Sequence, residues 1–271
     1  MTYYLPSTTE KVLRDYAHEC KNLGLLLDKY PPKSAIQDSR GKSEWLKKEV
    51  VLNNHIDFTL VRNAYRRWFD MTIAMGAQHF NATLEGRMVI GFGGSTVLET
   101  DLTLHHLYGV PYISGSALKG LTRTYVANEE EDYYIQSDNA SDGRVPSKDH
   151  ETDHEHIIEI FGSQKQAGTV IFFDAMPLDG KVNFAIDIMN PHYPDYYGQR
   201  KPPTNDQDPT PVSFLAVMNT TFTFALAPRQ QNKEEHLRHL EQVIPWAQKA
   251  LQKYGIGGKT SAGYGFFKKD N

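Results

Sequence analysis

The chain has 271 residues, of which 39% are apolar and 11% are aromatic. This composition is globular, and the length allows a large core and two subdomains. The chain has no apolar run of about 18 residues and no signal-peptide pattern at its start, so we expect a cytoplasmic protein without a membrane span. Its single cysteine, Cys20, excludes an internal disulfide and a cysteine-rich zinc site.

The net charge of −4 would by itself argue against a nucleic-acid partner. The acidity is concentrated in one segment, however. Residues 128–159 contain eleven acidic and two basic residues, a local charge of −9, so the other residues together carry +5. From Lys253 to Lys269 there are four lysines and no acidic residue. Attraction to phosphate depends on the local field, so the less acidic parts of the chain are compatible with RNA.

The first 82 residues predict a helical N-terminal extension. Apolar spacing predicts one helix from Thr8 to Asp28 and a second, stronger helix from Asp57 to Phe80. The connection at 29–44 is rich in Pro, Ser and Gly, and we expect it to lie outside the core.

The rest of the chain, 83–271, predicts alternating strands and helices. A strand at 83–91 is followed by a helix that begins near Ser114 to Ser116. An acidic loop at 128–159 comes next. Later segments predict strands at 169–178 and 183–193, one or two strands at 212–228, a helix at 233–254 that Pro245 should kink or split, and a short closing strand.

From residue 83 the order is therefore strand, helix, strand, strand, helix, strand. This order predicts an α+β protein with the ferredoxin-like plan, in which one antiparallel sheet carries both helices on the same face. We expect the other face to be free, and RNA-recognition domains commonly use that face.

The segment GIGGKTSAGYG, residues 255–265, predicts a phosphate contact. Main-chain N–H groups of such a loop can form a concave anion site, and side chains add one ammonium and two hydroxyls. The candidate residues are Gly257, Gly258, Lys259, Thr260 and Ser261. The alternative is an ordinary helix end and turn, with Gly255 as the left-handed cap. The segment is not a P-loop, because it lacks GxxxxGK[ST] and precedes a strand.

The segment around residue 114 offers a second phosphate contact. Ser114 or Ser116 can cap a helix whose first N–H groups attract anions. Lys119 and Arg123 are four residues apart, so they share one face of that helix. The alternative is a routine cap followed by a solvated helix face.

These two segments, GVPYISGSALKGLTR and then GIGGKTSAGYG, resemble the RAMP superfamily of CRISPR systems. Together with FFDAMPL, DIMNPHYPDYY and KPPTNDQDPTPVSFLAV in this order, they resemble the sixth-subunit family of type III-B (Cmr) effector complexes. The resemblance covers about residues 83–268. It implies a non-catalytic subunit at the end of an antiviral filament. Such a subunit binds the 3′ part of the CRISPR RNA and the target RNA, and it contacts other RAMP subunits.

The resemblance also implies where RNA would be held. The glycine-rich loop and the helix start at 114–123 would contact the guide backbone. An inserted β-hairpin thumb would lie at 190–211. Its candidate stacking groups are Tyr193, Tyr196 and Tyr197, and its candidate phosphate contacts are Arg200 and Lys201. The alternative for the tyrosines is packing under a proline-rich loop.

Two enzymatic alternatives stay open. His150, Glu151 and His154 match the letters of HExxH and would suit a metal-dependent hydrolase, but they lie in an acidic segment without an apolar helix. His105 or His106 could serve a metal-independent guide-processing endoribonuclease. Asp174 and Asp187 suggest a pair of carboxylates, but the sequence does not define their separation, and Asp174 is more simply explained as a hydrogen-bonded turn acceptor. We expect no catalytic residue, no metal and no cofactor.

Overall fold

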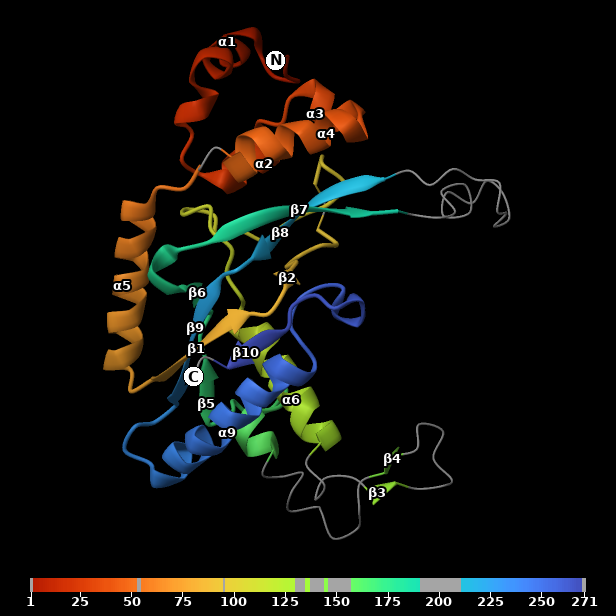
Figure 1. Cartoon of the computed structure of the whole chain (residues 1–271). Coiled ribbons are helices and arrows are strands. Elements are labelled where there is room, and N and C mark those ends of the chain that lie inside the picture. Colours follow the sequence, from red (N-terminus) through yellow and green to blue (C-terminus); the bar gives the residue numbers. More distant parts are fainter. Residues whose placement is uncertain are drawn as a thin grey trace. The chain divides into compact units, whose positions relative to one another are not determined.

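The computed structural model describes residues 2–52, 55–94, 96–129, 135–136, 144–145, 157–190 and 211–269 (Figure 1). The chain divides into two compact units that are each built from three separate segments. The first unit comprises Met1–Val61, Val89–Pro111 and Val182–Met218, and the second comprises Arg62–Met88, Tyr112–Lys181 and Asn219–Asn271. These units divide the chain at other positions than residue 82.

The N-terminal part of the first unit is a series of short helices. These are α1 Ser7–Tyr16, the 3-10 turn η1 Ala17–Glu19, α2 Leu23–Lys29, α3 Lys33–Gln37, α4 Ser39–Trp45 and the π-helical η2 Leu46–Leu52. The prediction of one helix from Thr8 to Asp28 is wrong. The helix breaks because Asn22 starts a new one, its side chain accepting a hydrogen bond from Leu25 N at 3.0 Å.

The prediction that 29–44 lies outside the core is also wrong. The segment forms α3 and most of α4, and Ala35 and Lys42 are buried. The ammonium of Lys42 donates to Leu98 O and to Thr100 Oγ1, so its charge is not left without partners. Burial holds the pKa of Lys42 below its usual range. Composition failed here because a polar side chain is buried together with its hydrogen-bond acceptors.

An antiparallel hairpin supplies the last segment of the first unit. Strand β7 Asn183–Met189 pairs with β8 Val212–Met218 along its whole length, from Asn183 opposite Met218 to Met189 opposite Val212. The excursion predicted as a thumb, 190–211, joins the ends of these two strands, and nearly all of it lies outside the described residues. The open choice for 212–228 is settled as two strands, β8 and then β9 Thr221–Pro228, with Asn219 between them at φ 43°.

The second unit contains the predicted sheet. Its strands are β1 Gln78–Leu84, β5 Val170–Phe172, β6 Met176–Pro177, β9 and β10 Phe267–Lys269, and its helices are α6 Gly115–Glu129 and α9 Glu234–Lys253. The sheet order is β10-β1-β9-β5, every pair is antiparallel, and β6 also pairs with β9. The prediction of an α+β protein with an antiparallel sheet is confirmed, and this arrangement of two strand–helix–strand halves is compatible with the ferredoxin-like plan.

Several element boundaries differ from the prediction. The segment 169–178 forms two short strands separated by a break, and α5 Phe58–Ala74 ends before β1 begins, so the predicted helix from Asp57 to Phe80 is too long. Helix α9 is one continuous helix through Pro245, and the predicted split does not occur. The remaining short strands are β2 Arg87–Met88 and the pair β3 Ile135–Gln136 and β4 Arg144–Val145. Among the described residues, no helix is long and apolar enough to cross a membrane.

The sheet face expected to be free is partly covered by α5. The Tyr65 hydroxyl lies 3.0 Å from Thr223 Oγ1 on β9, and Thr72 Oγ1 lies 2.7 Å from His79 Nε2 on β1. The Phe69 ring packs on the His79 ring, with centroids 4.4 Å apart. Helices α6 and α9 contact strands of the sheet as well, and Figure 1 shows them together, apart from α5. The prediction of a free face is therefore wrong where α5 lies.

The α5 contact predicts a pH dependence of stability. Burial lowers the pKa of His79 below its ordinary value, so the unfolded chain takes up a proton more readily than the folded chain. The free energy of unfolding should therefore fall as the pH is lowered from about 7 to about 5. Urea denaturation at several pH values measures this. His79→Gln should flatten the dependence, whereas the same change at the exposed His18 should leave it unchanged. An unaltered slope in His79→Gln would contradict the assignment.

Candidate nucleic-acid interface

The glycine-rich loop joins α9 to β10 (Figure 1). A main-chain hydrogen bond closes the base of this loop. Ile256 N donates to Gly265 O at 2.9 Å. Gly255 and Gly265 have φ of 68° and 78°, and a Cβ on Gly265 would lie 2.0 Å from Ile256 O. Only glycine fits this close approach without displacing main chain. The base of the loop is thus fixed by its own backbone packing.

Two further glycines also have positive φ, Gly257 at 98° and Gly263 at 88°. Four of the five glycines therefore meet a conformational requirement, more than a simple helix cap would explain. The number of glycines is therefore explained by the backbone conformation and does not by itself support RNA binding. An RNA contact at this loop has to be argued from the groups at its tip.

The loop tip presents polar groups on a tight turn. Lys259 is itself left-handed, with φ 60°, and the 3-10 turn η4 Thr260–Ala262 follows it. The N–H groups of Ala262 and Gly263 bond back to Lys259 O and Thr260 O. Ser261 is exposed, and Lys259 and Thr260 are half-exposed. The surface of the tip can therefore offer one ammonium and two hydroxyls to an anion.

The predicted start of α6 is confirmed in detail. Ser114 Oγ accepts a hydrogen bond from Ala117 N at 3.3 Å and lies 3.1 Å from Ser116 Oγ. Asp174, which follows β5, accepts from Gly115 N through Oδ1 at 2.7 Å, so its expected role as a hydrogen-bond acceptor is confirmed. A carboxylate of the chain itself thus occupies this helix N-terminus, where it repels a phosphate. The role of Ser114 and Ser116 toward phosphate stays a prediction.

The base of the loop contacts the C-terminal half of α6. Glu129 binds both the Lys253 ammonium and the Tyr254 hydroxyl, the latter at 2.5 Å. Arg123 is exposed and Lys119 is half-exposed, one turn apart on the same helix. At about 1.5 Å per residue, Ser114 lies about 20 Å along the axis from Glu129, whereas Arg123 lies less than two turns away. Of the predicted α6 residues, Arg123 is thus the nearer in sequence to the loop anchor.

The remaining predicted site residues divide into two groups. The thumb residues lie outside the described part of the chain, as do the residues of the HExxH-like run; these are Tyr193, Tyr196, Tyr197, Arg200, Lys201, His150, Glu151 and His154. Among the described residues, His105 is part of a local turn: its Nδ1 accepts from Leu107 N at 3.3 Å and its ring stacks on Tyr108. The carbonyl of His106 accepts from Asn22. Asp187 belongs to the first unit and Asp174 to the second.

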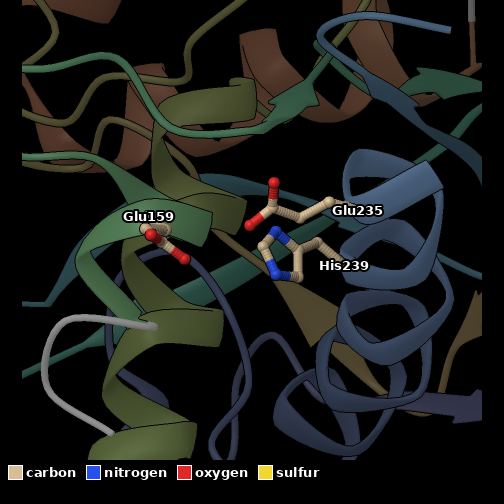
Figure 2. Close-up of side chains that lie close together, drawn as sticks. All are labelled: Glu159, Glu235 and His239. Carbon is tan, nitrogen blue, oxygen red and sulfur yellow. The ribbon is translucent and has the colours of Figure 1, made fainter. Parts of the chain in front are cut away.

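One group of polar side chains was missed in the sequence. Glu159, Glu235 and His239 gather in the second unit, with one candidate ligand atom of each within 4.8 Å of the others (Figure 2). Glu235 and His239 are four residues apart on α9, a spacing visible in the sequence. Glu159 comes from the helical stretch 157–161, and nothing in the sequence relates it to α9.

The sequence matches a known superfamily and two relatives. The RAMP superfamily matches residues 81–268, which include most of the sheet, α6, α9 and the glycine-rich loop. The CRISPR system Cmr subunit Cmr6 of Pyrococcus furiosus is 32% identical over 252 residues, covering 77% of this chain and 72% of that protein. Cmr6 of Saccharolobus solfataricus is 24% identical over 247 residues, covering 87% of this chain and 75% of that protein.

A chain in the cryo-EM structure of the type III-B Cmr-beta complex bound to cognate target RNA has the same fold. It superposes with a TM-score of 0.61 at 20% identity, covering 97% of this chain and 89% of that one. The resemblance seen in the sequence is thereby confirmed, both for the superfamily and for similarity to its sixth-subunit family. Because the superfamily match spans well over half of the residues, this chain belongs to the RAMP superfamily.

Proposed function

We propose that the chain is an RNA-binding subunit of a type III-B (Cmr) CRISPR effector complex. In this role it corresponds to Cmr6 and contacts other RAMP subunits in the cytoplasm. It binds the 3′ part of the CRISPR RNA and the target RNA at the end of the filament, in antiviral defence. The observation that carries the proposal is the 32% identity to Cmr6 of Pyrococcus furiosus over 77% of the chain.

The loop tip and α6 are the proposed contacts to the guide backbone. Lys259 with Thr260 and Ser261 offers a charge and hydroxyls on a turn of fixed shape, with Gly257 and Gly258 leaving the neighbouring main chain uncovered. Lys119 and Arg123 add cations on the helix that anchors the loop base. Neutralising phosphates in this way releases counterions, which gives affinity without sequence preference.

The thumb belongs to the same proposal. The fully paired strands β7 and β8 support a hairpin whose connecting residues are 190–211. Tyr193 and Tyr196 would stack on bases, and Arg200 and Lys201 would contact phosphates, so that the hairpin separates guide from target. Base–aromatic stacking contributes about 1–3 kcal/mol per base.

The proposed role is non-catalytic. His105, a candidate general base, accepts a hydrogen bond from Leu107 N through Nδ1, which uses that ring nitrogen in a turn. The acceptor Asp174 is used at the start of α6. These contacts support structural roles for His105 and Asp174.

Salt-dependent binding tests the proposed contacts. Lys259→Ala combined with Arg123→Ala should weaken CRISPR RNA binding by the assembled complex. The slope of log K against log salt should become shallower by about 0.7 for each lost phosphate contact on a single strand, about 1.4 for both. Filter binding at four or more salt concentrations measures the slope.

A control pair with the same charge change separates a site from a general charge effect. Arg238→Ala with Lys249→Ala removes two exposed cations from α9. This pair should leave the slope and the affinity near those of the unmodified complex. Equal loss in both pairs, or no loss in the first, would rule out the assignment of these residues.

A further inference from the structure

The cluster of Glu159, Glu235 and His239 combines an imidazole with two carboxylates. One candidate ligand atom from each side chain lies within 4.8 Å of the others. Figure 2 shows Glu235 and His239 projecting from α9 toward Glu159, which comes from the neighbouring helical stretch. These donors belong to segments far apart in the sequence, and they form a site that the RNA-binding proposal does not use.

The imidazole of His239 is buried, and the side chain of Thr169 holds its ring in place. His239 is only 4% exposed, whereas both glutamates are exposed. Its Nδ1 lies 2.8 Å from Thr169 Oγ1. Thr169 N in turn donates to Glu159 O at 2.8 Å, and Thr169 O accepts from Arg229 N at 2.7 Å. The residue that orients the histidine is therefore bonded through its main chain to one of the two glutamates.

This arrangement matches what a bound transition metal requires of its surroundings. A metal-binding histidine usually has its ring orientation and tautomer fixed by a second hydrogen bond, and such outer partners affect the affinity. An imidazole suits Zn²⁺ and similar ions, whereas Mg²⁺ and Ca²⁺ prefer oxygen ligands alone. Three protein ligands leave further positions for water.

We propose that Glu159, Glu235 and His239 bind one divalent transition-metal ion of the Zn²⁺ type, with Thr169 positioning the imidazole. The ion joins the helical stretch 157–161 to the first turns of α9. Its proposed role is structural, since it holds these two segments together. The competing explanation is a protonated His239 ion-paired with both carboxylates, which needs no metal.

Isothermal titration of the chelator-treated full chain with ZnCl₂ tests the proposal. Saturable binding of one Zn²⁺ per chain is expected in the presence of excess MgCl₂, together with a thermal unfolding temperature that rises with ZnCl₂. Glu159→Gln and Glu235→Gln, which keep side-chain size at exposed positions, should each weaken Zn²⁺ binding by at least about tenfold. Thr169→Val should weaken it by about tenfold or more, as loss of an outer hydrogen-bond partner does.

Control variants test whether the ion binds at this cluster. Glu234→Gln and Glu241→Gln remove exposed carboxylates from the same helix and should leave the affinity unchanged. His150→Ala with His154→Ala should also leave it unchanged. Absence of saturable Zn²⁺ binding overturns the proposal in favour of the ion pair. Equal loss in the α9 controls, or loss only in the His150 and His154 variant, overturns it in favour of diffuse acidity or an ion held elsewhere.

Discussion

Gly265→Ala is expected to destabilise the second unit by about 3 kcal/mol, from left-handed strain and a main-chain clash together. The added Cβ would lie 2.0 Å from Ile256 O, and φ at this position is 78°. The clash cannot be relieved by a flexible side chain. It would open the bond from Ile256 N to Gly265 O and the bond from Gly265 N to Arg87 O. The midpoint of urea denaturation followed by circular dichroism measures the effect.

Gly263→Ala is the matched control in the same loop. Its φ is 88°, but a Cβ there would have no neighbour within 4 Å. It should therefore cost only the left-handed strain, about 1 kcal/mol. If both variants lost the same stability, close packing at the loop base would not be the reason for Gly265.

The same pair separates folding from RNA contact. Gly263→Ala leaves the loop base intact and adds a methyl group at the residue that follows the turn Thr260–Ala262. A change in RNA affinity in this variant would therefore report on the tip and not on an unfolded loop. Gly265→Ala alone cannot make that distinction.

Features with local signals could be predicted from the sequence. The start of α6 was predicted correctly from Ser114, because a helix cap and the first turn of the helix depend on neighbouring residues. The order of strands and helices after residue 83 gave the ferredoxin-like plan, because apolar periodicity marks each element. The glycines around residue 260 marked a special backbone, although the structure explains four of them by conformation.

Features that depend on distant contacts could not be predicted. The sequence of α5 does not indicate that Tyr65 and Thr72 form hydrogen bonds with residues of β9 and β1. For this reason the sheet face was expected to be free. The segment that contains Lys42 was predicted to lie outside the core, because the hydrogen-bond acceptors of Lys42 are more than fifty residues away in the sequence. Asp174 was predicted to be a turn residue. Its contact with the N-terminus of α6 depends on the fold and has no signal in the sequence.

The candidate metal cluster shows the same limit. The spacing of Glu235 and His239 is a local signal, but it occurs often on solvated helices. Only the bond between Thr169 and His239, and the position of Glu159, distinguish this pair from others. Sequence analysis instead selected the HExxH-like run, whose letters are contiguous.

Phe224→Ala is expected to cost about 3–5 kcal/mol, the usual loss for a buried phenylalanine. Phe224 is fully buried in β9, the strand that pairs with β1, β5 and β6. Its ring stacks on Phe80 of β1 with centroids 5.0 Å apart, and it meets Phe267 of β10 edge-on at 5.7 Å. Truncation would leave a cavity among three strands.

Phe224→Leu keeps most of the volume and should cost less than about 1.5 kcal/mol. Comparison of the two variants by urea denaturation thus separates the cavity from the loss of ring contacts. Because Phe267 opens the strand that follows the glycine-rich loop, loosening of this aromatic cluster should also weaken RNA binding by the assembled complex as the temperature rises. A small and equal loss of stability in both variants would contradict a packed core at this position and, with it, the idea that the core fixes the loop for RNA.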